Sequence, residues 1–343
     1  MKNNEVLYIQ SRLKEPNRNF RLKSEVFADA IISGVRDKVF QLGEVLPSVN
    51  KLTTELDVSR KTVVSGYNLL KEKGIVGTRE RVGYYVASEN TTHQYNILMI
   101  FSTFNQYIQV FYNAFVEKLG KQGKIEVALH NANPNVFRAL LRDNINRFDK
   151  IIVSGFDHAV FRREIKKVSN DKLIMFSRLD GYKSSNNYYV QDFYKGTLGA
   201  LHQGVEEVKK YKNFYLLYNT KDWNFPRGIV DASLDFCKEH GMRFLQANDY
   251  KSVKNLKKTV FFIVNDMDLV GVLERVEEEG LILGVDAGLV SYNESPIKRV
   301  IRQGITTISV DFAEMGERVA HSLIHSEDNM EILETRLIKR NSL

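Results

Sequence analysis

Two adjacent cations, Arg60 and Lys61, follow Ser59 at the start of a segment in which apolar residues recur every three or four positions. This pattern predicts a helix with one buried face that begins after a Ser cap. Positive charge is unfavourable at a helix N-terminus because of the helix dipole. In the major groove of DNA, however, Arg at this position can reach guanine, and Lys or Thr62 can reach phosphates or base edges. This helix alone is equally consistent with DNA contact and with a solvated helix start that carries two incidental charges.

The neighbouring segments fit this interpretation. Residues 19–40 predict a helix of about five turns, and residues 46–57 predict a short helix capped by Ser48. Residues 75–86 predict a β-hairpin with the charged tip Arg79-Glu80-Arg81 and with Gly83 beside it. A short turn between two short helices, followed by a basic hairpin, is typical of a winged helix-turn-helix.

The composition is that of a globular protein with more than one domain. The chain has 343 residues, 43% of them hydrophobic and 27% charged, and its net charge of +7 permits an anionic partner. Its single cysteine, Cys237, cannot form an internal disulfide and is expected to be a buried thiol. We find no apolar run typical of a signal peptide or a membrane span, so we expect a cytoplasmic protein without a membrane partner.

A polar stretch without periodicity at residues 88–94 predicts a linker between a small domain, residues 1–87, and a large domain, residues 95–343. After the linker, buried apolar runs alternate with amphipathic segments. This alternation predicts βαβ units and parallel sheets. There are too many strands for one sheet, so we expect two lobes with a ligand cleft at the carboxyl ends of their strands.

Catalytic motifs are not recognisable. The sequence has no GxGxxG after a strand, no GxxxxGK[ST], no HExxH and no GxSxG. His321 and His325 are four residues apart in a predicted helix, but no acidic or Cys ligand has a suitable spacing nearby. We therefore predict no catalytic site, no metal and no cofactor. A carbohydrate-active enzyme with a fused DNA-binding module is the alternative.

Residues 20–87 resemble the winged helix-turn-helix domain of the GntR family of bacterial transcription regulators. The matching residues are Gly43, Leu46-Pro47-Ser48, Leu52, Val58-Ser59-Arg60, Thr62-Val63, Leu70, Gly74-Ile75, Gly83 and Val86. Asn50 stands where the family usually has Arg, and Val64 stands near the place of a second frequent Arg, so we expect an operator unlike the commonest family site. The resemblance implies that the DNA contacts are Ser48, Asn50, Ser59, Arg60, Lys61, Thr62, Arg79, Arg81 and Gly83.

Residues 95–343 resemble the effector domain of the LacI/GalR family, which has the type I periplasmic-binding-protein fold with two α/β lobes. The resemblance lies in SRLDG at 177–181, in Val190 and Asp192 before Gly196, in Asn265-Asp266, in residues 304–307 and in the tail LIKRNSL. It implies that the ligand contacts are Phe104, Asn105, Tyr107, Arg178, Asp192, Trp223, Arg227, Asn265, Asp266 and Asn293. Three of these have structural alternatives: Trp223 could pack between lobes, Arg178 could form an interlobe salt bridge, and Asp192 could serve the lobe crossover. Asn293 also stands where the family often has Asp.

Together, the resemblances imply a homodimeric, ligand-gated regulator, and we expect a repressor of carbohydrate utilisation genes. Its partners would be double-stranded operator DNA and a monosaccharide, of the arabinose or fucose type by analogy with arabinose-responsive repressors of this architecture. A sugar phosphate is an alternative effector. A free solute-binding protein is a further alternative, which the DNA-binding pattern disfavours.

Overall fold

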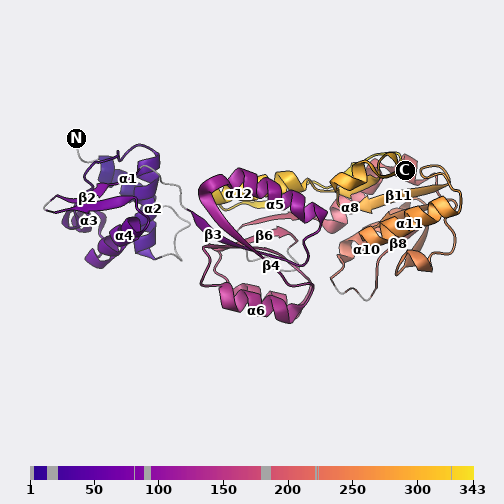
Figure 1. Cartoon of the computed structure of the whole chain (residues 1–343), viewed down its shortest axis with the longest axis horizontal. Coiled ribbons are helices and arrows are strands. Elements are labelled where there is room, and N and C mark those ends of the chain that lie inside the picture. The colour runs from indigo at the N-terminus through magenta and orange to yellow at the C-terminus, as the bar shows by residue number, and fades with distance from the viewer. Residues whose placement is uncertain are drawn as a thin grey trace. The chain divides into compact units, whose positions relative to one another are not determined.

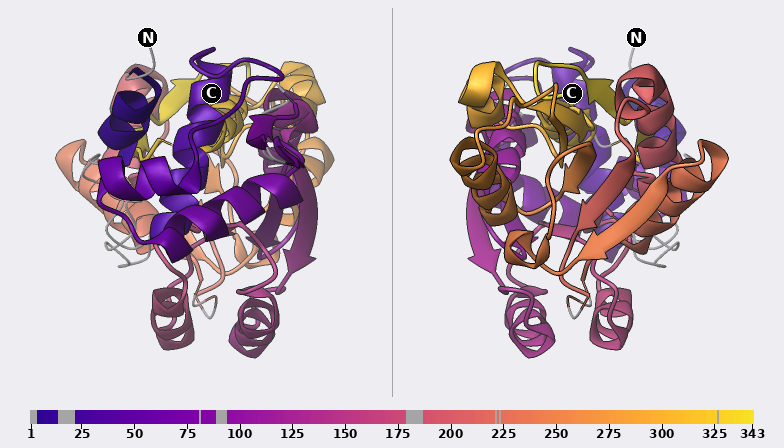
Figure 2. Two further views of the ribbon diagram at one scale, coloured as in Figure 1. Left: turned by 90° about the vertical axis from the view of Figure 1, so that its left-hand side faces the viewer. Right: turned by 90° about the vertical axis from the view of Figure 1, so that its right-hand side faces the viewer.

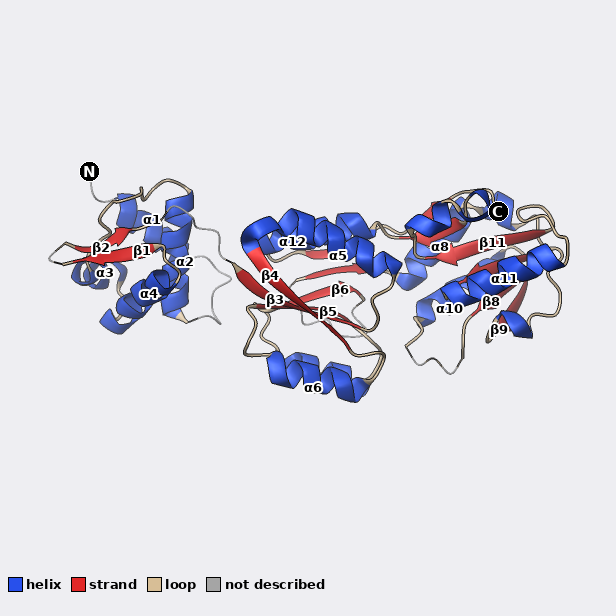
Figure 3. Ribbon diagram, viewed as in Figure 1, coloured by secondary structure: helices blue, strands red, loops and turns tan. Residues whose placement is uncertain are grey.

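The computed structural model of the chain describes residues 4–13, 22–80, 82–88, 94–178, 187–220, 222, 224–325 and 327–343. The chain divides into two compact units, Met1–His93 and Gln94–Leu343. The first contains helices and a hairpin, and the second contains two sheets with helices on both faces (Figures 1 and 3). The predicted fold class, a small winged helix-turn-helix followed by a two-lobed α/β domain, is confirmed.

In its described residues, the small unit is a cluster of four helices with a two-stranded wing. Its antiparallel hairpin pairs Val76 with Val86. The elements are α1 (Asn4–Leu13), α2 (Lys23–Arg36), α3 (Val49–Leu56), α4 (Arg60–Glu72), β1 (Val76–Arg79) and β2 (Gly83–Val86). Helix α1, whose Val6 and Ile9 are buried in the core of this unit, was not predicted from the sequence.

Close packing fixes α4 on the other elements of the small unit. A Cβ on Gly66 would lie 2.4 Å from the Phe27 ring and 2.9 Å from the Ser24 carbonyl oxygen. The backbones of α2 and α4 therefore lie too close together at this point for any side chain larger than that of Gly. The Tyr67 hydroxyl donates to the Pro47 carbonyl oxygen at 2.6 Å, and its ring stacks on Tyr84 of the wing with centroids 4.0 Å apart. One buried tyrosine therefore ties α4 to the start of α3 and to β2.

The first lobe of the large unit is built on a six-stranded parallel sheet with the order β13-β7-β6-β5-β3-β4. Its strands are β3 (Tyr95–Phe101), β4 (Gly123–Leu129), β5 (Lys150–Ser154), β6 (Leu173–Ser177), β7 (Tyr188–Gln191) and β13 (Met330–Leu333). Helices α5 (Gln106–Leu119) and α12 (Phe312–His325) cover one face, and α6 (Pro134–Asn144) and α7 (Ala159–Glu164) cover the other (Figure 1).

The second lobe has a six-stranded sheet with the order β14-β12-β11-β10-β8-β9, in which only the pairing of β14 with β12 is antiparallel. This lobe faces the viewer in the right-hand panel of Figure 2. Its strands are β8 (Asn213–Leu217), β9 (Arg243–Ala247), β10 (Thr259–Ile263), β11 (Ala287–Tyr292), β12 (Thr306–Ser309) and β14 (Arg336–Ile338). Its helices are α8 (Phe193–Gln203), α9 (Val205–Val208), α10 (Arg227–Glu239) and α11 (Asp266–Glu278).

Helices α8 and α10 share a core with one face of the second sheet, and α11 packs on the opposite face. Short 3₁₀ turns complete the large unit at Gly120–Gln122, Ile165–Lys167, Tyr250–Ser252, Pro296–Arg299 and Ile301–Gln303. Among the described residues, no helix is long and apolar enough to cross a membrane.

The chain passes between the two lobes three times: after β7, after β12 and after β13. Each lobe is therefore assembled from segments that are distant in the sequence. The strands β9, β11 and β13 were not predicted. β9 and β13 are sheet-edge strands that mix charged or polar residues with apolar ones, and β11 has Gly288 as its second residue, so their patterns are weaker than those of the other strands.

Candidate DNA-binding and ligand-binding sites

The helix-turn-helix is set by two Ser caps and a left-handed turn residue. Helix α3 ends at Leu56 and is followed by Asp57, whose φ is +51°, and α4 begins at Arg60. The Ser59 hydroxyl oxygen accepts a hydrogen bond from the Thr62 backbone N–H at 3.1 Å, and Ser48 accepts from the Lys51 N–H at 3.3 Å. Both predicted Ser contacts thus also serve as helix caps, which satisfy backbone donors that a helix start leaves free.

The predicted cations lie at the exposed start of α4. Arg60 and Lys61 are both exposed, and Arg60 donates from Nη1 to the side-chain oxygen of Asn50 at 2.6 Å. This bond brings the first turns of α3 and α4 together. The arrangement places two helix N-termini, a guanidinium and an ammonium on one surface, which is suited to binding a polyanion.

The wing adds a further cation. The Arg79 guanidinium lies 4.3 Å from the centre of the Tyr85 ring, a cation–π contact that holds the arginine along the strand. Gly83 begins the return strand with φ +104°, a conformation that other residues rarely adopt. Arg81, at the predicted tip, lies outside the described residues.

A cavity of about 180 Å³ lies in the large unit and is lined by residues from both lobes. Its residues follow the carboxyl ends of β3, β4, β5, β6, β7, β10 and β11, the edge where open α/β sheets bind ligands. The aromatic lining residues are Phe101, Tyr107, Phe156, Phe176, Phe193, Phe225 and Tyr292. The polar ones are Ser102, Thr103, His130, Ser154, Ser177, Arg178, Gln191, Asp222, Asn224 and Asn293.

Three lining residues carry buried polar atoms without a hydrogen-bond partner in the described part of the chain. They are Nδ1 of His130 in the first lobe and the side-chain oxygens of Asn224 and Asn293 in the second. A buried polar group without a partner costs about 1–3 kcal/mol. Burial also lowers the pKa of His130 to about 4, so its imidazole is neutral at pH 7. The cavity is thus equipped to hydrogen-bond a polar molecule.

Arg178 joins the two lobes at this cavity. It follows β6, donates from Nη1 to the backbone carbonyl oxygen of Asn224 at 2.7 Å, and lies 5.7 Å from the ring centre of Phe193. Arg178 therefore joins the two lobes through a hydrogen bond to a carbonyl oxygen, whereas the structural alternative was an interlobe salt bridge. The same side chain also lines the cavity.

A buried lysine, Lys298, holds the backbone of Asn293 by a hydrogen bond. Lys298 is 2% exposed and donates from Nζ to the carbonyl oxygens of Tyr292 and Asn293 at 3.1 and 2.9 Å. Its third partner is Asp266, with Nζ and Oδ1 3.0 Å apart. Burial lowers the pKa of Lys298. These bonds stabilise the left-handed backbone of Asn293, whose φ is +62°.

Of the predicted ligand residues, Tyr107, Arg178 and Asn293 line the cavity. Trp223 lies outside the described residues. The others, which are absent from the cavity lining, are Phe104, Asn105, Asp192, Arg227, Asn265 and Asp266. Their ligand-binding roles stay predictions.

Three of these six residues are helix caps. Asn105 caps α5 by accepting from the Ile108 N–H at 3.2 Å, and Asn265 caps α11 by accepting from the Met267 N–H at 2.7 Å. Asp192 caps α8, accepting two backbone N–H bonds at 3.0 and 2.9 Å, which is the crossover role considered for it.

The remaining three have other positions. Phe104 is 41% exposed and packs edge-on against Tyr112, Arg227 is the exposed first residue of α10, and Asp266 pairs with Lys298.

Several lining residues were missed by the sequence analysis. Ser102, His130 and Ser154 lie at or just beyond the carboxyl ends of β3, β4 and β5. The rule that ligands meet the carboxyl ends of strands could have identified them. Gln191 ends β7 and could have been identified by the same rule. Asn224 lies in the loop beyond β8 and has no comparable signal, because the fold alone brings it to the cavity.

Comparison with known families separates the chain into the same two parts. Residues 23–86 match the gntR family of bacterial regulatory proteins. Residues 210–343 match the periplasmic binding protein-like domain. A comparison with curated proteins finds no sequence match.

Solved structures share the fold of the large part of the chain. The trehalose repressor from Escherichia coli is 16% identical with a TM-score of 0.60, covering 71% of this chain and 99% of its own. A LacI family transcriptional regulator from Lactobacillus casei with bound sucrose is 17% identical with a TM-score of 0.60, covering 72% and 99%. The transcription regulator CcpA of Lactococcus lactis is 14% identical with a TM-score of 0.58, covering 73% and 99%.

Proposed function

We propose that this chain, which joins a gntR-family helix-turn-helix domain to a periplasmic-binding-protein-like domain of the LacI/GalR type, is a ligand-responsive transcription regulator. Its DNA partner would be a double-stranded operator, and operator binding places the proposed activity in the cytoplasm. The proposed role is binding without catalysis, as a homodimeric repressor of carbohydrate utilisation genes.

The start of α4 supports the DNA-binding part of the proposal. Arg60 and Lys61 are exposed at a helix N-terminus where neither stabilises the helix dipole. We assign base contact to Arg60 and Thr62 and phosphate contact to Lys61, with Ser48, Asn50 and Ser59 shaping the surface between the two helix starts. The wing residues Arg79, Arg81 and Gly83 complete the proposed interface.

The single observation that carries the effector part is the set of partnerless polar atoms in the cavity. His130, Asn224 and Asn293 present these atoms from both lobes, between aromatic walls. Sugar hydroxyls would satisfy the polar atoms, and aromatic rings pack against the C–H faces of sugars. The cavity volume of about 180 Å³ lies below the ~300–1,000 Å³ typical of larger ligands. The size favours a monosaccharide, and we retain the arabinose or fucose type as the first to test.

A sugar phosphate is the second candidate, and Arg178 is the observation that favours it. A guanidinium at the cavity can bind a phosphate through two parallel hydrogen bonds.

The proposed mechanism is closure of the two lobes around the effector. Contacts such as Arg178 to Asn224 join the lobes at the cavity, so a ligand bound there stabilises one lobe arrangement over others. In a dimer, this change would alter the spacing of two winged helices on half-sites about one helical turn apart, and operator affinity would follow effector occupancy.

A thermal-shift screen of the full chain tests the effector assignment. The panel contains pentoses, hexoses, deoxyhexoses and their phosphates. We expect at least one neutral monosaccharide to raise the melting temperature in a concentration-dependent way. Stabilisation by phosphorylated sugars alone would select the second candidate, and no response to any sugar would contradict the proposal.

A further inference from the structure

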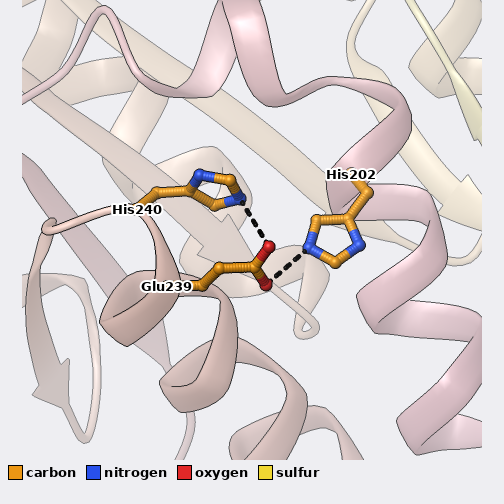
Figure 4. A group of neighbouring side chains, drawn as sticks. All are labelled: His202, Glu239 and His240. Carbon is orange, nitrogen blue, oxygen red and sulfur yellow. Dashed lines mark hydrogen bonds and ion pairs between the residues drawn. The ribbon is translucent and has the colours of Figure 1, made fainter.

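A cluster of two histidines and one glutamate lies on the second lobe, outside the cavity lining (Figure 4). His202 belongs to the last turn of α8, Glu239 is the last residue of α10, and His240 follows it. The Nε2 atom of His202 is 3.0 Å from one Glu239 carboxylate oxygen, and Nε2 of His240 is 3.8 Å from the other. One ligand atom of each residue lies within 4.8 Å of the other two.

Phe236 orients both rings. Its centroid lies 5.6 Å from that of His202 and 4.6 Å from that of His240. The Nε2 atom of His240 is buried and has no hydrogen-bond partner among the described residues, while the His202 side chain is 40% exposed. The cluster thus combines a fixed, partnerless ring nitrogen with an opening to solvent.

The geometry points to a Zn²⁺ site formed by His202, Glu239 and His240, with water as a fourth ligand. Two imidazole nitrogens and one carboxylate suit Zn²⁺, whereas Mg²⁺ and Ca²⁺ prefer oxygen ligands alone. Tetrahedral ligands about 2.0–2.1 Å from zinc are about 3.3 Å apart. The two imidazole nitrogens lie 3.0 and 3.8 Å from different oxygens of the Glu239 carboxylate, and one ligand atom of each residue lies within 4.8 Å of the others. Side-chain rotations that bring these three atoms closer together would complete the site.

A metal at this site would link the C-terminal ends of α8 and α10, two helices that begin at the cavity. Phe193 begins α8 and Pro226 directly precedes α10, and both line the cavity. Near these starts the helices already touch, because a Cβ on Gly228 would lie 2.8 Å from the Tyr194 backbone nitrogen. A metal at the opposite ends would fix the pair at two points and stabilise the second lobe. This inference does not depend on the proposed regulatory function.

Calorimetric titration of the metal-free full chain with ZnCl₂ tests the site. We expect one equivalent to bind tightly, and we expect His202→Ala and His240→Ala to weaken this binding at least about tenfold each. The matched control is the double variant His321→Ala/His325→Ala, which removes another close histidine pair, on α12, with rings 4.2 Å apart. The assignment would be overturned if the control no longer bound one equivalent of Zn²⁺ tightly, or if the variants without His202 or His240 bound it as tightly as the wild type.

Thermal unfolding gives a second readout. Zn²⁺ should raise the melting temperature of the wild-type chain, and Mg²⁺ should not. Glu239→Gln, at a side chain that is 56% exposed, should fold normally, as circular dichroism would check, and lose most of the zinc-dependent rise. The zinc effect should also weaken as the pH is lowered, because protons compete for the imidazole nitrogens. An equal rise with Mg²⁺, or a full zinc response in Glu239→Gln, would contradict the inference.

Discussion

Arg178 donates from its guanidinium to the backbone carbonyl oxygen of Asn224, 2.7 Å away, and this bond joins the two lobes of the large unit at the cavity. The guanidinium also lines the cavity, together with several aromatic rings. Arg178 therefore combines two proposed roles, contact with the effector and contact between the lobes.

Arg178→Ala should raise the Kd of the effector by about tenfold or more, because a buried polar contact and the interlobe bond are both lost. Calorimetry with the sugar found in the thermal screen measures the change. Arg142→Ala, on the exposed face of α6, is the control and should bind like the wild type. Wild-type affinity in Arg178→Ala would remove this residue from the effector site.

Arg60→Ala should weaken binding to the selected operator by about 1–3 kcal/mol and relax the preference at one base position. Fluorescence anisotropy with the operator and with single-base variants of it measures both effects. Lys71→Ala, near the opposite end of the same helix, should leave affinity nearly unchanged. If Arg60→Ala binds every duplex as the wild type does, α4 does not present Arg60 to bases.

Lys61→Ala should weaken binding to all duplexes alike and reduce the salt dependence of log Kd by about one unit of slope. Titrations at several salt concentrations measure the slope. An unchanged slope would contradict the assignment of Lys61 to a phosphate.

His130 should make stability depend on pH. Its pKa is lowered by burial to about 4, while an exposed histidine has a pKa near 6.5. The unfolded chain therefore binds the extra proton first, so the stabilising contribution is complete above pH 6.5 and declines as the pH falls towards 4. At pH 5 the decline amounts to about 2 kcal/mol.

Urea unfolding at pH 7.5 and 5.0 gives the free energy of unfolding of the wild type and of His130→Gln. We expect the variant to lose less stability than the wild type between these two pH values. His325→Gln, at an exposed position on α12, should keep the wild-type pH dependence. An equal pH dependence in His130→Gln and the wild type would show that His130 does not carry it.

Two glycines on neighbouring helices should respond oppositely to alanine. A Cβ on Gly228 would meet backbone atoms of Tyr194 and Phe193 at 2.8 and 3.0 Å, so Gly228→Ala must separate α8 from α10 and should cost about 1–3 kcal/mol. Nothing lies within 4 Å of a Cβ on Gly199 in α8, so Gly199→Ala should stabilise by up to about 1 kcal/mol. Thermal unfolding of both variants measures the two changes in stability. Equal effects would contradict the close approach of the helices.

The sequence predicted the elements that have strong periodicity. The start of α4 was placed correctly at Arg60, because a Ser cap and an apolar repeat define it. Helix α1 was missed, since its apolar residues from Val6 to Ile9 are consecutive and show no clear helical spacing. Tertiary packing buries Val6 and Ile9 in the core. Tertiary packing also decides the edge strands β9 and β13.

The candidate site was harder to predict than the fold. Asn105, Asp192 and Asn265 follow strands, as ligand residues would, yet each turns its side chain back to cap the next helix. The sequence looks the same for a polar side chain that caps a helix and for one that enters the cavity. The His202–Glu239–His240 cluster was missed because only the packing of α8 against α10 joins residues 37 positions apart.

Operator affinity measured with and without effector tests the central claim most directly. The full chain is titrated onto a fluorescent operator selected from random DNA, in the absence and in the presence of saturating sugar. We predict a change in operator Kd of at least about fivefold, the lower end of typical allosteric coupling, and a much smaller change in Arg178→Ala at the same sugar concentration. An identical operator Kd with and without a sugar that demonstrably binds the chain would contradict the account.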